Sequence, residues 1–179
     1  MATEIERRFL VRDAAFLAGR SGERIVQGYV AKESGSMTTR VRIRAGRGYL
    51  TLKGARYGLS RQEFEYEIPA EDACRILDGF CGNRLIHKTR YLVPFAGYIF
   101  EVDVFEGRHA GLIIAEVELQ RETETILLPP WVETEITHDS QYGNFALSHF
   151  EGPLLPCDAQ AAVAAAERSQ CAAPGMAAH

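Results

Sequence analysis

Cysteine is scarce in this sequence, and its spacing fits no metal site. Four cysteines occur among 179 residues, and no two of them form a C-x-x-C pair. Zinc sites and disulfide frameworks depend on numerous or closely spaced cysteines, so neither is expected here. We expect free thiols, which are typical of a reducing compartment such as the cytoplasm.

Long apolar runs and a large excess of one charge are also missing. No stretch approaches the roughly 20 apolar residues that a membrane-spanning helix needs. The first residues are acids and arginines rather than a secretory signal. The net charge is −4, whereas general nucleic-acid binders are usually basic. We therefore expect a cytoplasmic protein that contacts neither a membrane nor a nucleic acid.

The remaining composition is that of an ordinary globular domain. Hydrophobic residues make up 46% of the chain and charged residues 25%, which is typical of such domains. Residues 1–155 carry mostly strand patterns and are expected to form one domain, mainly β with a few short helices. Beyond Pro156 the sequence turns alanine-rich, and we expect residues 156–179 to be a frayed or disordered tail without chemistry.

The most informative pattern is an alternation of charged and apolar residues. Alternate side chains of a β-strand lie on opposite faces, so each such segment predicts a strand with one charged face. Charges of one sign gather within a segment, since Arg40, Arg42 and Arg44 lie about 7 Å apart along one face. Paired carboxylates recur in four further segments, at Glu4 with Glu6, Glu63 with Glu65, Glu101 with Asp103, and Glu116 with Glu118.

Two arrangements fit these strands. One is an ordinary antiparallel sheet whose charged face is in water. The other is a closed sheet whose charged faces line the interior. The set of strands favours the closed sheet, because a solvated face usually mixes signs, whereas here the signs are separated strand by strand. The apolar faces would then pack against helices outside, and Trp131, after two prolines, is expected to plug one end.

Arginines and carboxylates in one interior are typical of a site for a metal–polyphosphate complex. Guanidinium groups bind phosphate oxygens in a bidentate manner. Carboxylates without histidine or cysteine favour Mg²⁺ or Mn²⁺ over zinc. A site for polyanions alone would not place carboxylates beside its arginines. The combination therefore indicates metal ions that bridge carboxylates to phosphate oxygens.

In this order and spacing, the motifs resemble the CYTH domain, also called the triphosphate tunnel metalloenzyme family. Glu4-x-Glu6-x-Arg8 is similar to the E-x-E-x-K signature that opens the domain, with Arg8 where the family usually has lysine. The other motifs follow over about residues 2–147: Gln27-Gly28-Tyr29, Arg40-x-Arg42-x-Arg44, Thr51-Leu52-Lys53, Arg61-x-Glu63-x-Glu65, Lys88-x-Arg90, Glu101-Val102-Asp103 and Glu116-Val117-Glu118. The resemblance implies a closed eight-stranded antiparallel β-tunnel with short helices packed outside. It also implies hydrolysis or transfer on a linear triphosphate with Mg²⁺ or Mn²⁺.

The resemblance and the chemistry together suggest roles for individual residues. We expect Glu4, Glu6, Glu116 and Glu118 to hold one or two metal ions, with Asp103 assisting. The phosphate chain would be bound by basic residues, namely Arg8, Arg40, Arg42, Arg44, Lys53 and Arg90. By family analogy, Lys88 near Tyr29 would orient or deprotonate the attacking water, which requires a depressed lysine pKa. Supporting roles are expected for Arg61, Glu63, Glu65 and Glu101; occasional metal binding by Glu63 and Glu65 is the less favoured alternative.

The expected reaction is metal-dependent hydrolysis of inorganic triphosphate to diphosphate and phosphate, by in-line attack of water. The alternatives are a class IV adenylate cyclase, a thiamine-triphosphatase and a non-enzymatic polyphosphate-binding module. We identify no nucleobase pocket in the sequence, which favours the inorganic substrate, and the carboxylate pairs argue against the binding module. The expected partner is a small-molecule triphosphate, and the protein is expected to act as a monomer or homodimer.

Overall fold

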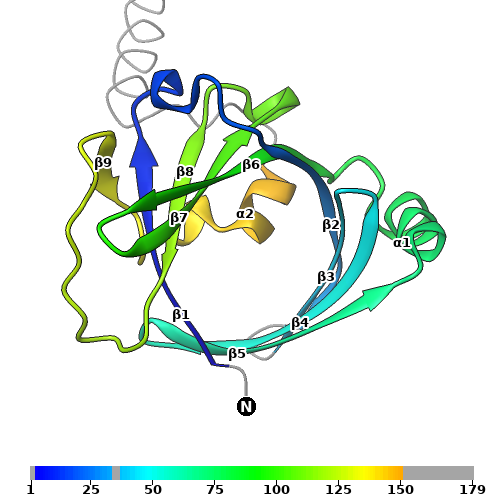
Figure 1. Cartoon of the computed structure of the whole chain (residues 1–179). Helices are drawn as coiled ribbons and strands as arrows, with labels where there is room; N and C mark the ends of the chain where they lie inside the picture. Colours follow the sequence, from blue (N-terminus) through cyan, green and yellow to red (C-terminus); the bar gives the residue numbers. More distant parts are fainter. Residues whose placement is uncertain (1–2, 34–36, 151–179) are drawn as a thin grey trace, which may run out of the picture.

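A computed structural model describes residues 3–33 and 37–150, which form nine strands and two short α-helices (Figure 1). The strands are β1 (Thr3–Val11), β2 (Glu23–Glu33), β3 (Met37–Arg44), β4 (Arg47–Tyr57), β5 (Ser60–Ile68), β6 (Ile86–Phe95), β7 (Tyr98–Phe105), β8 (Ile113–Glu118) and β9 (Val132–Glu135). The helices are α1 (Ala70–Ile76), which a π-type turn continues through Leu77–Cys81, and α2 (Asn144–His149). Within these described ranges, no helix is long and apolar enough to cross a membrane. The predicted tail at 156–179 lies outside them.

Eight of the strands close into an antiparallel barrel. Going round the ring, the order is β1-β5-β4-β3-β2-β6-β7-β8, and β8 pairs again with β1. The ring is closed by the pairing of β1 with β5, which in the described part of the chain covers Thr3–Gln62, Glu4–Arg61 and Ile5–Ser60. Beyond that point β9 takes the place of β5 at the edge of β1. The predicted closed eight-stranded β-tunnel is confirmed.

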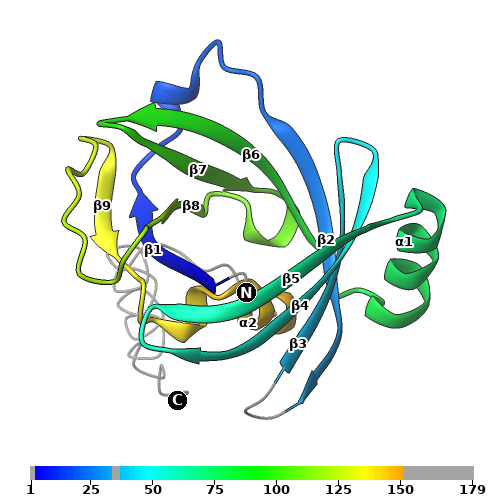
Figure 2. The same ribbon diagram turned by 60° about the horizontal axis from the view of Figure 1, so that its bottom comes forward.

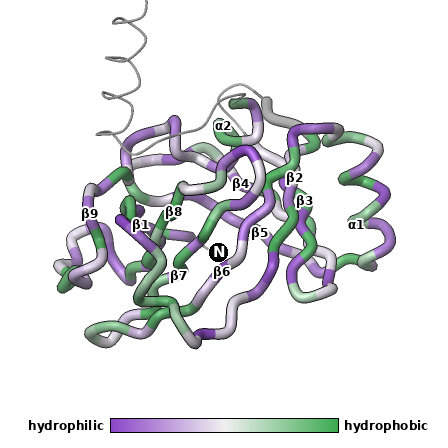
Figure 3. Tube along the Cα trace, turned by 90° about the horizontal axis from the view of Figure 1, so that it is seen from above, coloured by the Kyte–Doolittle hydropathy of each residue, from purple (hydrophilic) through white to green (hydrophobic). Residues whose placement is uncertain are grey.

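Tight hairpins fix the register of neighbouring strands. The β3–β4 turn consists of Ala45 and Gly46, with φ of 49° and 77°, and the β6–β7 turn of Ala96 and Gly97, with φ of 49° and 86°. Two-residue turns with positive φ at both positions match the right-handed twist of strands. The register that they set keeps alternate side chains facing the interior. Figure 3 shows hydrophilic and hydrophobic residues following one another along these strands.

Helix α1 packs outside the barrel, as predicted. It lies against β3 and β4, and its buried residue Ala73 shares a cluster with Val41 of β3 and with Leu77. Contact is close, because a Cβ on Gly48 of β4 would lie 2.7 Å from the Cβ of Ala73. The following turn is equally close, since a Cβ on Gly28 of β2 would lie 2.6 Å from Sγ of Cys81. Both glycines are therefore needed for helix-to-sheet packing.

Trp131 does not plug the barrel, so that prediction is wrong. Its ring stacks on Phe16 at 4.4 Å between centroids and meets Phe100 edge-on at 5.5 Å. Phe100 is fully buried in the cluster formed by the outward faces of β1, β7 and β8. Trp131 thus belongs to the outer core, where the segment before β9 covers the sheet.

One end of the barrel is filled by apolar side chains and α2. Lumen-facing rows end in Leu10, Ile86, Phe105 and Ile114, each two residues along its strand from a charged position. These residues share a buried cluster with Leu147 of α2. Figures 1 and 2 show α2 within the outline of the ring, whereas α1 lies outside it. Helix α2 therefore packs on lumen-facing side chains and leaves the charged part of the interior open.

Candidate active site

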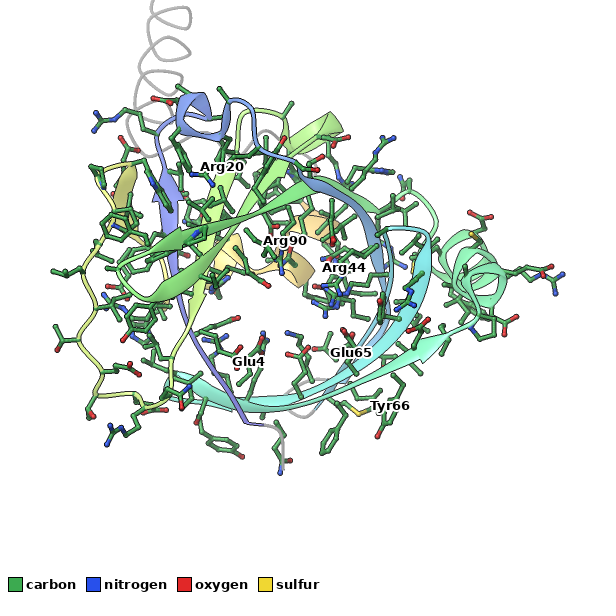
Figure 4. All side chains as sticks on the ribbon, in the orientation of Figure 1. Glu4, Arg20, Arg44, Glu65, Tyr66 and Arg90 are labelled. Atoms are coloured by element: carbon green, nitrogen blue, oxygen red, sulfur yellow. The ribbon has the colours of Figure 1, made fainter. Side chains whose placement is uncertain are left out.

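The charged faces of the strands enclose a cavity of about 1560 Å³. In Figure 4, Glu4, Arg44, Glu65 and Arg90 extend from four different strands into the lumen, while Tyr66 points outward. All of the predicted site residues except Lys88 and Asp103 line this cavity. Of the two arrangements that fit the sequence, the closed sheet with a charged interior is the one observed.

Three buried bases form one side of the cavity, which we call the basic wall: Arg40 and Arg42 of β3 and Lys53 of β4. Lys53 Nζ lies 2.6 Å from Oε2 of Glu63 and 3.2 Å from Oε2 of Glu4. Burial lowers the pKa of Lys53, and the neighbouring Arg40 lowers it further, against the opposite effect of Glu4.

Glu65 of β5 holds both arginines of the basic wall. Arg42 Nη2 donates to Glu65 Oε1 at 2.9 Å, and Arg40 Nη2 donates to Oε2 at 3.3 Å. Thr51 Oγ1 donates to the same Oε2 at 2.8 Å. Burial alone would raise the pKa of Glu65, but Arg42, Thr51 and Arg40 lower it overall. This geometry is that of a residue that fixes the guanidinium groups, although the supporting role of Glu65 stays a prediction.

Four carboxylates form the opposite side, which we call the acidic wall: Glu4 and Glu6 of β1, and Glu116 and Glu118 of β8. The strand register places Glu6 directly opposite Glu118, and Glu116 opposite Glu101 of β7. Burial raises the pKa of Glu6, and the carboxylates of Glu116 and Glu4 raise it further. Nearby cations do not offset this effect at Glu6. At Glu4, in contrast, burial would raise the pKa, but a hydrogen bond with Glu63 and the charges of Lys53 and Arg61 lower it overall.

Arginine side chains donate hydrogen bonds to the carboxylates of the acidic wall. Arg61 Nε donates to Glu4 Oε2 at 2.7 Å, and Arg61 Nη2 donates to Glu6 Oε1 at 3.3 Å. Arg56 Nη2 also donates to Glu6 Oε1, and Arg90 Nη2 to Glu116 Oε2 at 3.0 Å. In residues 3–33 and 37–150, no three histidine, cysteine or carboxylate side chains converge as metal ligands do. The donor set still fits Mg²⁺ or Mn²⁺, because it offers oxygen ligands alone and a raised carboxyl pKa that a divalent cation would reverse.

Lys88 and Asp103 form a buried pair behind the cavity surface. Both side chains are 1% exposed, and Lys88 Nζ donates to Asp103 Oδ2 at 2.5 Å. Arg90 donates from Nε to Oδ1 at 2.7 Å and from Nη2 to Oδ2 at 2.6 Å. Burial would raise the pKa of Asp103, but Arg90 and Lys88 lower it to about 2. Metal binding by Asp103 stays a prediction, because its carboxylate already accepts three hydrogen bonds from Lys88 and Arg90.

Helix α2 contacts both Lys88 and Tyr29 through two consecutive residues. Lys88 Nζ donates to Asn144 Oδ1 at 3.3 Å, and the Tyr29 ring meets the next residue, Phe145, edge-on at 5.2 Å. Burial lowers the pKa of Lys88, against the opposing effect of Asp103. Burial also raises the pKa of Tyr29 to about 12. Asn144 was not predicted as a site residue, because nothing in the sequence indicates that α2 reaches the lumen.

Arg8 and Arg44, which were also predicted to bind phosphate, differ in their partners and exposure. Arg8 donates to the main-chain oxygens of Tyr142 and Thr137, both at 3.2 Å, so its guanidinium ties β1 to the segment before α2. Arg44 is 31% exposed and lies 3.5 Å from Glu23. Arg44 is therefore the more accessible of the two to an incoming anion.

Arg56 is a lumen residue that the alternation of charges does not reveal. Counting in twos from Lys53 places Ala55, not Arg56, on the inner face. The pairing of β4 with β5 shifts between Lys53–Glu63 and Arg56–Arg61, so that two residues of β4 oppose one of β5. Such a bulge reverses which side chains face inward. The available signal is Gly54, because an isolated glycine within a strand pattern often marks a bulge.

Known proteins are similar to this chain in sequence and in fold. The model of the CYTH domain matches residues 2–152. The chain belongs to the CYTH domain family. An inorganic triphosphatase of Acetivibrio thermocellus is 41% identical over 144 residues, which cover 80% of this chain and 92% of that protein. An inorganic triphosphatase of Nitrosomonas europaea is 37% identical over 150 residues, which cover 82% and 97%.

Solved structures carry the same CYTH fold. The crystal structure of an inorganic triphosphatase superposes with a TM-score of 0.63 at 33% identity and covers 85% of this chain and 98% of its own. A Pyrococcus furiosus protein, at 22% identity and a TM-score of 0.52 over 67% of this chain and 80% of its own, shows the fold alone. The predicted family is confirmed, while the roles of individual CYTH residues stay predictions.

Proposed function

We propose that this CYTH protein hydrolyses inorganic triphosphate to diphosphate and phosphate with the help of Mg²⁺ or Mn²⁺. The observation that carries the proposal is the division of one cavity into a basic wall and an acidic wall. The identities of 41% and 37% to two inorganic triphosphatases support it. In this proposal the protein is a cytoplasmic enzyme, active as a monomer or homodimer on a small molecule.

The basic wall would bind the phosphate chain. Arg40, Arg42 and Lys53 are buried and held in place by Glu63 and Glu65, so their donors are oriented before substrate arrives. Pre-oriented donors stabilise charge on a leaving group without the cost of reorganisation. Arg44 and Arg90 would complete the set from the neighbouring strands.

The acidic wall would hold the metal ions, which when bound neutralise phosphate oxygens and orient water. Glu6, Glu116 and Glu118 lie on adjacent strands that face one lumen. Glu4 lies at the junction of the two walls, because Lys53 and Arg61 both contact it. The closeness of the walls would let phosphate oxygens and carboxylates share a cation.

Lys88 would act as the general base that accepts a proton from the attacking water. The oxygen of water would attack the terminal phosphorus while the bond to the bridging oxygen breaks and diphosphate leaves, and Lys88 in its neutral amine form would accept the proton that water loses. A lysine can do this only with a depressed pKa, and burial depresses the pKa of Lys88. Asp103 and Asn144 fix the position of Nζ.

Phosphate release tests the proposal directly. Purified protein is incubated with Mg²⁺ and, in separate reactions, with inorganic triphosphate, ATP or thiamine triphosphate, and phosphate and cyclic AMP are measured. We expect fastest phosphate release from inorganic triphosphate and none after addition of EDTA. Cyclic AMP from ATP, or faster release from thiamine triphosphate, would replace the proposal by the corresponding activity. Binding without any turnover would show a polyphosphate-binding module.

A further inference from the structure

Arg56 occupies a carboxylate that is expected to bind metal. Its Nη2 donates to Oε1 of Glu6, and Arg61 Nη2 donates to the same oxygen at 3.3 Å. A carboxylate oxygen that already accepts from two guanidinium groups has little capacity left for a cation, and two positive groups also repel a third. Metal binding at Oε1 of Glu6 would therefore displace at least one arginine.

The second terminal nitrogen of Arg56 is an unused donor. Nη1 is buried and has no hydrogen-bond partner in the described residues, although the side chain as a whole is 27% exposed and lines the cavity. A buried donor without a partner costs free energy, which a ligand acceptor can recover. This nitrogen is suited to an anion in the tunnel.

The backbone that carries Arg56 is anchored separately from its side chain. Arg56 follows the β4 bulge and precedes the turn to β5. Glu122, from the loop after β8, accepts a hydrogen bond from the main-chain nitrogen of Leu59 in this turn at 3.1 Å. The guanidinium can therefore change partners while the strand stays in place.

We propose that Arg56 exchanges Glu6 for a phosphate group when metal binds, and so makes metal and triphosphate binding depend on each other. The inference rests on the proposed function. Metal at Glu6 releases the guanidinium into a cavity where Glu4 already contacts Arg61 and Lys53, and Glu116 contacts Arg90. The phosphate chain then supplies the acceptors for both Nη1 and Nη2.

Calorimetry on Arg56→Gln tests this exchange. With Mg²⁺ alone, we expect the variant to bind the ion about three- to tenfold more tightly than the wild type, because its competitor is gone. With triphosphate in EDTA, both proteins should bind within about twofold of each other, since Arg56 is then still held by Glu6. At saturating Mg²⁺, the KM for triphosphate should rise about tenfold. A purely structural role would instead weaken both ligands.

Two further variants separate direct exchange from loss of charge. Arg44→Gln removes an arginine from the same cavity whose ion-pair partner is Glu23 rather than Glu6, and it should change Mg²⁺ affinity by less than about twofold because distant charges are screened. Arg56→Lys keeps the positive charge but loses the two-pronged guanidinium donor. Its Mg²⁺ affinity should lie between those of the wild type and Arg56→Gln. Circular dichroism checks that each variant is folded.

The outcomes distinguish the inference from the function on which it rests. Unchanged or weaker Mg²⁺ binding by Arg56→Gln, or equal tightening by Arg44→Gln, overturns the exchange. An unchanged KM at saturating Mg²⁺ also overturns it. If the wild type hydrolyses no triphosphate, the proposed function fails. The exchange is then decided by the triphosphate dissociation constant measured with Mg²⁺, which Arg56→Gln should raise about tenfold.

Discussion

The two walls of the tunnel are built from the same alternating pattern but differ in electrostatic balance. On the basic wall, Arg40 and Arg42 share Glu65, whose pKa is lowered because the arginines outweigh its burial. On the acidic wall, burial and neighbouring carboxylates raise the pKa of Glu6 despite its arginine partners. The charge of Glu65 is thus balanced by its arginines, whereas Glu6 has too little positive charge around it, which a bound cation would supply.

The largest effect is expected from neutralising the acidic wall. Glu116→Gln should lower turnover of triphosphate by about a thousandfold or more, because loss of a metal ligand removes stabilisation of charge in the transition state. Phosphate release at saturating Mg²⁺ measures it. Glu133→Gln, which removes an exposed carboxylate paired with Arg12 outside the lumen, should retain full activity. Full activity of Glu116→Gln would remove Glu116 from the metal site.

Removing an arginine of the basic wall should have a smaller effect, on the KM for triphosphate rather than on turnover. Arg42→Ala should raise the KM for triphosphate by about ten- to a hundredfold, because the variant loses a charge-assisted hydrogen bond to phosphate. The fall in kcat should be much smaller. Arg47→Ala, on the exposed part of β4 beside Glu67, is the matched control. An unchanged KM for Arg42→Ala would contradict the assignment of this wall to substrate.

Replacing a glutamate by glutamine should affect the stability of the ligand-free protein differently at the two walls. Glu6→Gln should leave the free energy of unfolding unchanged or raise it by roughly 1 kcal/mol, since the raised pKa of Glu6 means that its charge is disfavoured. Glu65→Gln should lower it by about 0.5 kcal/mol, a value reduced for solvent screening. Urea unfolding at pH 7 in EDTA compares the variants. Equal destabilisation by both would show that the walls do not differ in balance.

The smallest effect is the pH dependence of the Glu65 contribution. Its pKa is lower in the folded protein, so the folded state binds fewer protons and the contribution is fully present above the unfolded value of about 4.5. As pH falls through the folded pKa, the stability difference between wild type and Glu65→Gln should disappear. Urea unfolding at a series of pH values from 7 to 3 follows this difference. A difference that does not shrink at all as pH falls from 4.5 to 3 would assign it to packing rather than charge.

The strands and their charged faces could be predicted from the sequence because a period of two has one structural meaning. Once the side chains of Arg40, Arg42 and Arg44 share a face, the closed register of the barrel places them in the lumen. The bulge at Gly54 breaks the period, so Arg56 was missed. A local shift of one residue is decided by pairing with β5, which a pattern along one strand does not contain.

The positions of α2 and Trp131 depend on contacts between distant parts of the chain. Leu147 fits a helix core equally well outside or at the end of a barrel, and its partners Leu10 and Phe105 lie far away in sequence. Trp131 stacks on Phe16 for the same kind of reason. The apolar residues that end each charged row, such as Leu10 after Arg8, were an available indication that one end is filled.

Among the residues that the structure describes, the ladder between β1 and β5 is the shortest in the ring, with three residue pairs, and it contains Glu4 opposite Arg61. Local unfolding at this seam separates the two strands and also parts Glu4 from Arg61, which are bonded at 2.7 Å. A ligand that contacts both walls holds the seam shut, because ligand binding stabilises only the closed form. Slower amide hydrogen exchange along β1 and β5 would therefore report occupancy of the tunnel, and under the proposed function the substrate would add to the rigidity of the fold.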